Sequence, residues 1–583
     1  MTVEAKQIID RFQTMSSNRA GWESVWSDIN NVCYPSGPRQ SSYSGFGMMN
    51  SDDVWRQPET ARRAPRIYDT TGVIALDRAA SGVESLITPQ AQQWHELGFA
   101  DANAPPPTLD EEAWMDKVTE YLFKVRYNPR TGWLLSHQRA ISSTLALGTG
   151  VYYIEEAYGA RDADELQVPM RYCPVPLNEA YLGVNDFGEH DTCIRSFLMT
   201  NVQAYDKFGD RLPEKVIGDA KDTGRQDNSA QYLHCVIPSD ELKGANPQFP
   251  FTSIYIHYDT RSIISQGGFF DFPFVVYTWT VPSNSPYGES PAMIALPELK
   301  SLQLMSRDAL LASQLSIRPA VATAFELDRP VNLNPGAINP KMIDPNTGRP
   351  LVAPILSSGD PRLFENTMEL RRQAVRAALF SDLFNVLANK PNMSATEAMI
   401  RNQEKGELLG PAASRIQIGL SRAVERELGI LARKGAFDKG MVFEPPASMA
   451  GRLVTVNFTS PIDRARQMPE VTGMQQTLQF AGAMAQFAPD IMDNFDTDAM
   501  MARARYLLGA PPLAQRAPEL VKGMRKEKAN AAAAQRQAQQ MSATLDATKN
   551  LPATAEGITA MGDIAAKAGI NANLAGMAQS VNP

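Results

Sequence analysis

The stretch Pro286–Ile317, with the sequence PYGESPAMIALPELKSLQLMSRDALLASQLSI, decides how the rest of the chain is interpreted. From Pro291 to Ile317 it predicts one long helix with only four charged residues, Glu298, Lys300, Arg307 and Asp308. Leucine and methionine side chains fall on all sides of this helix instead of on one stripe. A helix of that kind has to be covered on most of its surface.

The residues that follow first lose and then regain helical character. Residues 318–360 contain prolines at positions 319, 330, 335, 340, 345, 350 and 354, which forbid a long helix and confine pairing to short or edge strands. A helix is predicted again from Pro361 to about Ala388, and it breaks at Asn389–Met393. Ser394 and Glu397 then form a capping-box pattern that starts a third helix, which can run to about 434 with kink points at its internal glycines and Pro411.

The segment before this stretch predicts helices followed by strands, so the fold class is α+β. Helical patterns cover residues 3–15, 21–33, 68–88, 108–126 and 132–147, with a surface loop at 35–66. Short β-branched and aromatic runs predict strands at 151–154, 179–184, 192–199, 231–237, 253–258 and 274–280. A further strand is predicted at 452–459.

The C-terminal segment has little with which to build a core. No aromatic residue follows Tyr506, and from about Lys526 Ala, Gln, Met and Asn dominate. Such a segment is either a helix bundled against copies of itself or a disordered tail.

Composition excludes several classes of protein. The 583 residues, 43% hydrophobic and 21% charged, correspond to about three or four domains. There are 56 Lys and Arg against 64 Asp and Glu, and this net charge of −8 argues against a protein that coats nucleic acid through excess cations. The N-terminus lacks the apolar core of a signal peptide, and no long apolar run predicts a membrane span, so we expect a soluble chain made in the cytoplasm.

Motifs for catalysis, cofactors and metals are missing from the sequence. It contains no GxxxxGK[ST], GxGxxG, HExxH or GxSxG pattern, and its four cysteines form no CxxC pair. Asp186-Phe187-Gly188 is interpreted as a hairpin turn, His234-Cys235 as strand residues, and the acidic residues 490, 493, 496 and 498 as helix caps or a solvated face. We expect no catalytic residues, no cofactor and no metal, and therefore a structural protein rather than an enzyme.

The order of these features resembles the portal proteins, or head-to-tail connectors, of short-tailed bacteriophages. The resemblance rests on Pro286–Ser290 leading into an apolar helix, the Pro-rich insert, the return helix, the break and the capped run Ser394–Arg401. The segments Gly72–Gln90 with Trp94, the exit Leu145–Gly150 into a strand, the hairpin at 186–188 and the Ala/Gln/Met-rich C-terminus agree with it. It extends over residues 20–540.

The resemblance implies a ring-forming portal fold, usually of twelve copies, at one vertex of the capsid. By position, residues 1–290 are the wing, 291–317 and 361–388 the stem helices, 318–360 a small α/β clip, and 389–393 the tunnel loop. Residues 394–460 are the long kinked helix and return strand of the wing, and 461–583 form the helical crown or barrel and the tail. The resemblance gives no role to the 35–66 loop or to the tail beyond Met541.

The implied function is a channel for double-stranded DNA during packaging and ejection, in the virion, after assembly in the host cytoplasm. Implied partners are other copies of the chain, the terminase large subunit, tail adaptor and tail proteins, and the major capsid and scaffolding proteins, with no membrane. Implied site residues are Asn389, Lys390, Pro391, Asn392 and Met393 in the tunnel loop, Lys300, Arg307, Arg371, Arg372 and Arg376 in the stem channel, and Arg329, Lys341 and Arg349 in the clip.

The distribution of charge agrees with a channel through which DNA slides. Residues 286–434 carry 18 Lys and Arg against 15 Asp and Glu, a net charge of +3, which leaves −11 for the rest. Duplex DNA has one negative charge per ~1.7 Å, so a strongly basic channel would hold it. We expect a low-friction conduit in which Lys390 makes a transient phosphate contact, with an ordinary solvated lysine as the alternative.

Other interpretations stay open at this stage. Arg371, Arg372 and Arg376 have Glu365 and Glu369 within one or two turns, which favours ion pairs over DNA contacts. The insert at 318–360 is either a clip or an ordinary Pro-rich loop. The competing functions are a tail adaptor or capsid protein, and an oligomeric tail-associated hydrolase whose active site forms between subunits.

Overall fold

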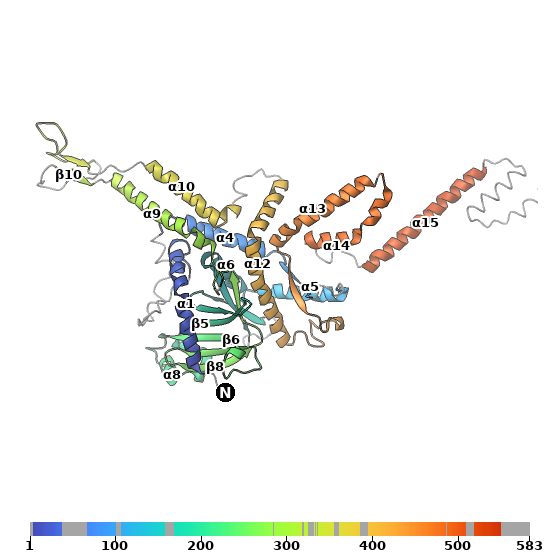
Figure 1. Cartoon of the computed structure of the whole chain (residues 1–583), viewed down its shortest axis with the longest axis horizontal. Helices are drawn as coiled ribbons and strands as arrows, with labels where there is room; N and C mark the ends of the chain where they lie inside the picture. The colour runs from blue at the N-terminus through green and yellow to red at the C-terminus, as the bar shows by residue number, and fades with distance from the viewer. Residues whose placement is uncertain are drawn as a thin grey trace, which may run out of the picture. The chain divides into compact units, whose positions relative to one another are not determined.

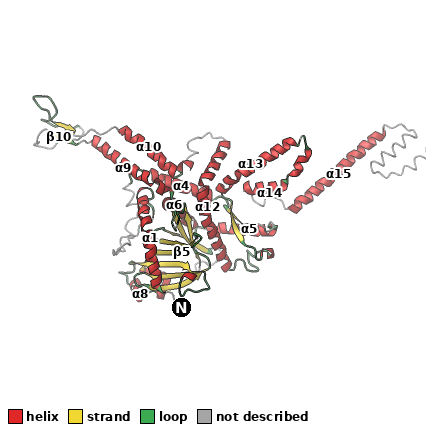
Figure 2. Ribbon diagram, in the orientation of Figure 1, coloured by secondary structure: helices red, strands yellow, loops and turns green. Residues whose placement is uncertain are grey.

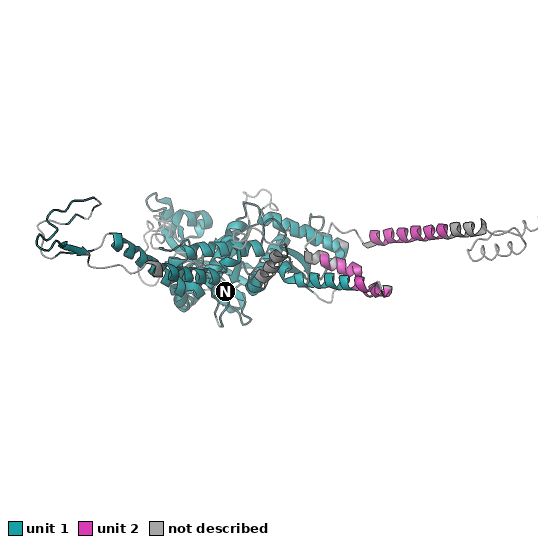
Figure 3. Ribbon diagram, turned by 90° about the horizontal axis from the view of Figure 1, so that it is seen from above, with its two compact units in different colours: residues 1–480 teal, residues 481–583 magenta. Residues whose placement is uncertain are grey.

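The structure of the chain is a computed structural model. The residues that it describes form both helices and strands, which confirms the α+β class (Figure 2). The chain divides into two compact units, residues 1–480 and residues 481–583, instead of the three or four domains expected from its length (Figure 3). The described residues are 4–37, 67–100, 107–157, 168–283, 285–317, 320–323, 331–332, 334, 336–354, 361–384, 395–485, 487–508 and 518–549.

The first helix is continuous, where the sequence predicted two helices. Helix α1 spans Ala5–Val32. Its middle is held by Arg19, whose buried guanidinium donates hydrogen bonds to the carbonyls of Leu177, Asn178 and Ala180. Because these bonds tie the predicted break to residues 177–180, the helix continues through it.

The other N-terminal helices lie where their patterns predict them. They are α4 (Thr71–Ile87), α5 (Leu109–Arg126) and α6 (Trp133–Leu147). Helix α5 begins with a capping box between Thr108 and Glu111. Helix α6 ends at Gly148, whose φ of 83° is left-handed and where an added Cβ would lie 1.8 Å from the carbonyl oxygen of Gly288, so only glycine fits.

Residues 149–278 of the first unit form two antiparallel sheets, of which strands β5, β6 and β8 are labelled near α1 and α8 in Figure 1. Their strand orders are β3-β2-β9 and β4-β5-β6-β7-β8. The sequence predicted six of these eight strands and missed β3, which is half-apolar and contains Pro174, and β8, which contains two glycines. The bounds are β2 Thr149–Glu156, β3 Met170–Val175, β4 Ala180–Val184, β5 His190–Thr200, β6 Ser229–Pro238, β7 Phe251–His257, β8 Ser262–Phe269 and β9 Phe274–Thr278.

Short helices that the sequence did not predict lie between β5 and β7. They are α7 (Asn201–Phe208), α8 (Glu214–Lys221) and the 3-10 turns η2 (Gly209–Arg211) and η3 (Ser239–Glu241). Helix α7 starts at a capping box in which Gln203 replaces the usual glutamate, and its eight residues are too few for a helical period to stand out.

A two-stranded sheet joins distant parts of the chain. Strand β12 (Val454–Phe458), which the sequence predicted, pairs antiparallel with β1 (His95–Phe99), which it did not. The segment HELGF of β1 contains a charged residue and a glycine, so its sequence alone does not favour a strand. It forms one because it pairs with β12.

The insert lies between two helices that pack against each other. Helix α9 (Pro291–Ile317) has the predicted bounds, and α10 spans Pro361–Ala378, ending ten residues before the predicted end at 388. The chain turns at Phe380, whose φ is 57°, into the 3-10 helix η4 (Ser381–Phe384). Within the described part of 318–360 the insert contains an antiparallel strand pair, β10 (Val321–Thr323) with β11 (Val352–Pro354), and no helix.

The long third helix is present as predicted. Helix α12 spans Ala395–Arg433 with Pro411 inside it, and it is followed by η5 (Ala447–Met449) and α13 (Pro461–Met484). The second unit contains η6 (Pro489–Asn494), α14 (Thr497–Leu508) and α15 (Pro518–Lys549). The carboxylate of Asp496 accepts the backbone N–H groups of residues 498 and 499, which confirms the capping interpretation for that residue.

An ion pair without solvent contact crosses the core of the first unit. Arg126, at the end of α5, donates two hydrogen bonds to the carboxylate of Glu427 in α12, at 3.1 and 2.5 Å, and both side chains are fully buried. Tyr172 of β3 donates to the same carboxylate at 2.7 Å. Arg126 also lies 2.6 Å from Nε2 of His95, and because a guanidinium only donates, that nitrogen accepts and the imidazole is neutral. Burial and the charge of Arg126 hold the pKa of His95 well below its usual value.

Breaking this pair should destabilise the whole first unit. Glu427→Gln keeps the shape of the side chain but leaves the Arg126 cation buried without its counter-charge, so we expect a loss of about 3–5 kcal/mol in the free energy of unfolding. Chemical denaturation measures it. The control is Glu120→Gln in α5, which removes an exposed pair with Lys124 and should cost less than about 0.5 kcal/mol. Equal effects of the two substitutions would contradict the assignment.

Candidate functional site

The paired helices α9 and α10, with the insert between them, form the candidate site (Figure 1). Within the described chain, the buried residues of α9 lie only in its first half, from Pro291 to Gln303. In the second half, large apolar side chains are about half-exposed or more, namely Leu304, Leu310, Leu311, Leu315 and Ile317. The cover that the sequence requires for this helix is therefore incomplete over its distal half within the described chain.

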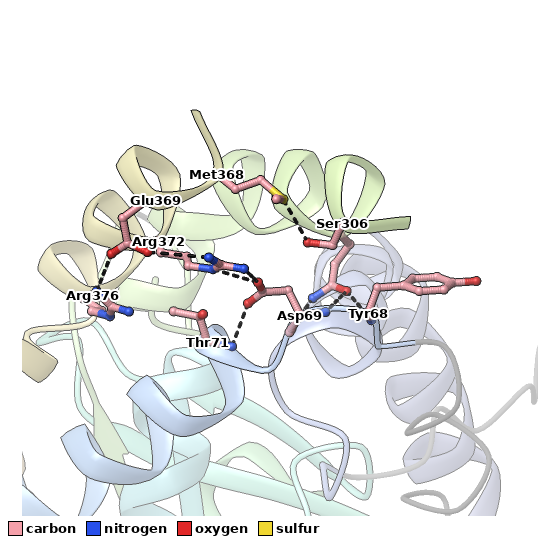
Figure 4. A network of polar contacts seen from close by, with 9 residues as sticks. Tyr68, Asp69, Thr71, Ser306, Met368, Glu369, Arg372 and Arg376 are labelled. Atoms are coloured by element: carbon pink, nitrogen blue, oxygen red, sulfur yellow. Dashed lines mark hydrogen bonds and ion pairs between the residues drawn. The ribbon is translucent and has the colours of Figure 1, made fainter. Parts of the chain in front are cut away.

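A polar network fixes the base of the two helices against the start of α4 (Figure 4). The Gln303 side chain accepts the backbone N–H groups of Tyr68 and Asp69 and donates to the carbonyl of Asp69, at 2.7, 3.0 and 2.6 Å. Oδ1 of Asp69 accepts the N–H of Thr71 at 2.9 Å, at the start of α4. These bonds leave the second carboxylate oxygen of Asp69 directed toward α10.

That oxygen meets a run of alternating charges on α10. Nε and Nη2 of Arg372 both lie 2.9 Å from Oδ2 of Asp69, and Arg372 also pairs with Glu369, which pairs with Arg376 at 3.0 Å. Burial acts to raise the pKa of Asp69, but the hydrogen bonds from Thr71 and the Arg372 guanidinium outweigh it, so the pKa lies below its usual value. The carboxylate stays charged over the ordinary pH range and holds α10 in place.

The remaining cations expected in the stem are also paired within the chain. Arg371 of α10 lies 2.6 Å from Glu298 of α9, and Lys300 lies 2.6 Å from Asp28 of α1. Arg307 pairs with its neighbour Asp308 at 3.0 Å. The ion-pair interpretation of the three α10 arginines is therefore confirmed, although Glu365 is not among their partners.

The acidic partners Asp28, Asp69 and Glu298 are residues that sequence reasoning missed. Asp69 and Arg372 are 303 residues apart, and only Glu369 lies at helical spacing from the arginines it neutralises. Local spacing finds pairs within one helix, and it carries no signal for pairs between elements.

The insert presents a hydrogen-bonded turn at its far part. Asp344 accepts the N–H of Asn346 and the hydroxyl of Thr347, and its own N–H donates to the carbonyl of Arg349. Lys341 adopts a left-handed φ of 65°. Ile338 and Ile343 nearby are strongly exposed, at 89% and 64%. Arg329, the third expected clip contact, lies outside the described residues.

Other expected positions also lie outside the described residues. These are the whole tunnel-loop segment, Asn389, Lys390, Pro391, Asn392 and Met393, and residues 38–66 of the N-terminal loop. Their assignments stay predictions.

No metal-binding group appears in the part of the chain that the structure describes. His234 is buried and stacks on Tyr255, with ring centroids 4.1 Å apart, and it hydrogen-bonds Ser253. None of the helices in the described ranges has both the length and the apolar character needed to cross a lipid bilayer.

Comparison with known proteins gives consistent matches over nearly the whole chain. The family model "Bacteriophage head to tail connecting protein" matches residues 5–514. The "Portal protein" of Salmonella phage epsilon15 is 28% identical over 547 residues, covering 91% of this chain and 92% of the relative. The "Probable portal protein" of Bordetella phage BPP-1 is 24% identical over 567 residues, covering 93% and 94%.

One solved structure shows a distant likeness. A chain in "Virion of native gene transfer agent (GTA) particle" is 13% identical with a TM-score of 0.33, covering 76% of this chain and 90% of that one. A likeness at this level supports no conclusion about the fold.

The Asp69–Arg372 contact should contribute stability that depends on pH. Asp69→Asn is expected to cost about 1–3 kcal/mol in the free energy of unfolding at pH 7, because it removes hydrogen bonds between charged groups. Since the pKa of Asp69 is lowered in the folded chain, this contribution is complete above the usual carboxyl pKa of 3.8 and is lost as pH falls through the lowered value.

Denaturation of the wild type and the variant at pH 7 and pH 3 measures this contribution. The difference between the two proteins should shrink at pH 3. Asp308→Asn is the control on α9, because its pair with Arg307 is exposed and worth less than about 1 kcal/mol. A gap between wild type and Asp69→Asn that is the same at both pH values would contradict the role of the charge.

Proposed function

The chain belongs to the family of bacteriophage head-to-tail connecting proteins, and on that premise we propose that it is the portal subunit of a short-tailed phage. In this role twelve copies form a ring at one capsid vertex. The ring is the channel for double-stranded DNA during packaging and ejection, and the platform to which the terminase large subunit and later the tail proteins attach.

The observation that carries the ring is the partly covered distal half of α9. Five large apolar side chains there are about half-exposed or more, on a helix whose buried residues lie only in its first half within the described chain. Burying such surface yields roughly 25 cal/mol per Å², which favours association with the same helices of neighbouring copies. Head-to-tail contacts that close into a ring supply that cover for every copy.

The ion pairs support a channel that does not grip DNA. Each of the five expected stem cations, Lys300, Arg307, Arg371, Arg372 and Arg376, is matched by a carboxylate of the same chain. A paired cation has less to gain from a phosphate, so fewer counter-ions are released on DNA contact and sliding meets less resistance. The role proposed here is mechanical and needs no catalytic residue or cofactor.

The other regions take the roles that their positions suggest. The insert at 318–360 is the clip that contacts terminase and tail adaptor, with Arg329, Lys341 and Arg349 as contact residues, and 389–393 is the tunnel loop. Residues 1–290 and 394–460 form the wing, which faces major capsid and scaffolding proteins, and 461–583 form the crown. Assembly takes place in the host cytoplasm.

Electron microscopy of the purified protein tests the ring and the clip together. We expect rings with an axial hole a few nanometres wide, and a compact monomer would overturn the proposed function. Replacing Asn332–Thr347 by a short Gly-Ser linker keeps strands β10 and β11, so rings should persist while terminase no longer binds them in a pull-down. Full terminase binding by the shortened ring would remove the clip assignment.

Lys390 is the residue expected to touch DNA. Lys390→Ala should lower packaging efficiency or change the packaged DNA length, because one phosphate contact is lost from every copy in the ring. Lys215→Ala in α8 is the control, because this exposed lysine lies outside the tunnel loop, the stem and the clip, and it should leave the packaged length unchanged. Packaging assays that find no change with Lys390→Ala would exclude the contact.

A further inference from the structure

The hairpin between β4 and β5 ends in an exposed aromatic side chain. Phe187 is 89% exposed, which makes it the most exposed aromatic residue in the described part of the chain. Asp186 beside it is exposed too, and it forms no ion pair with any described residue. An aromatic ring with a flanking charge at a tip is the kind of group that anchors protein–protein contacts.

The tip is held rigidly. The side-chain carbonyl of Asn185 accepts the N–H groups of Phe187 and Glu189, at 3.0 and 2.9 Å, and Gly188 adopts a φ of 78° that closes the turn. At the base, Arg422 of α12 pairs with Glu189 at 2.7 Å. A rigid mount lowers the entropy lost when the tip is bound.

A hollow with complementary character lies elsewhere on the same unit. It measures about 670 Å³ between the end of α1, helices α4 and α6, and strand β3. We call it the socket, and Ile74, Arg78, Leu135, Arg139, Pro174 and Pro176 are among the residues that line it. Ile74 and Leu135 are 47% and 50% exposed at its rim.

The charges at the socket match those at the tip. Arg78 and Arg139 line it together with one acid, Asp77, so its net charge is positive. Arg139 is exposed and forms no ion pair within the ranges that the structure describes. The socket thus combines apolar surface with a positive rim, and the tip combines an apolar ring with the negative Asp186.

A closed ring needs such a pair of unlike patches. In a head-to-tail ring, each copy uses one surface toward one neighbour and a different, complementary surface toward the other. The tip and the socket are formed by different residues of one chain, and they match in both polarity and charge. Complementary charges of this kind fix the register of a contact and select against wrong partners.

We infer that the Asp186–Phe187 tip of one copy inserts into the α4–α6 socket of the next copy, so that Phe187 covers Ile74 and Leu135 while Asp186 faces Arg139. This inference rests on the proposed ring. It goes beyond the ring by naming the wing residues through which neighbouring copies recognise each other, apart from the stem.

Cysteine cross-linking between two differently tagged chains tests the contact. Phe187→Cys in one chain and Leu135→Cys in the other are co-expressed, purified as mixed assemblies and treated with a short bismaleimide. A cross-linked dimer carrying both tags is expected. Phe270→Cys with Leu135→Cys is the matched control, because Phe270 is also an exposed aromatic residue, at 51%, but lies beside the end of β8; this pair should give no mixed dimer. Wild-type chains control for the four native cysteines.

Charge reversal supplies an independent measurement. Asp186→Arg should lower the yield of the Phe187→Cys to Leu135→Cys cross-link at least several-fold by placing two cations together, and adding Arg139→Asp should restore it. Restoration excludes misfolding as the cause of the loss, and a loss without restoration would count against the Asp186–Arg139 contact.

Electron microscopy of the same samples separates the possible failures. Rings without the mixed cross-link, or with links only between two Phe187→Cys chains, would overturn the tip-in-socket contact and leave the portal function intact. Absence of rings in the wild-type sample would overturn the proposed function and the inference with it.

Discussion

The buried pair of Arg126 and Glu427 is the constraint on which the first unit depends. Two charges without solvent contact are tolerated only when each satisfies the other, and here a tyrosine and a neutral histidine complete the set. The two residues are 301 positions apart, one before the sheets and the other in α12 beyond the insert. Their contact therefore joins α5 to α12, two helices that are far apart in the sequence. Helices α9 and α10 extend from the core that this contact stabilises.

Helices α9 and α10 are stabilised unequally along their length. Near the base, Asp69, Gln303 and Arg372 bind α9 and α10 to the start of α4, and several ion pairs connect the two helices to the chain. Farther out, α9 has large apolar side chains that the described chain leaves about half-exposed or more. The polar side chains at the base of the two helices thus have partners within the chain, whereas the apolar side chains farther along α9 stay partly exposed. This division suits a subunit whose neighbours cover the exposed apolar side chains.

Sequence patterns predicted the elements whose character is local. The bounds of α9, the start of α12 near 395 and strand β12 follow from periodicity and helix breakers. The errors fall where distant contacts decide. Arg19 carries α1 through a predicted break, β1 becomes a strand by pairing with β12, and α10 ends where Phe380 turns the chain into η4. In the insert, the prolines predicted short strands at most, and the described residues contain one short strand pair.

The sequence by itself determined the order of the long helices around the insert, the family resemblance and the shortage of charge on α9, because each of these depends on residues close together along the chain. Only the tertiary structure decided what the charges do. The neighbouring glutamates already favoured ion pairs for the arginines of α10, but two of the partners, Asp69 and Glu298, come from segments that local spacing does not reveal. The physical reason is that a charge interacts over a few ångströms of space, whatever the separation of the residues in sequence.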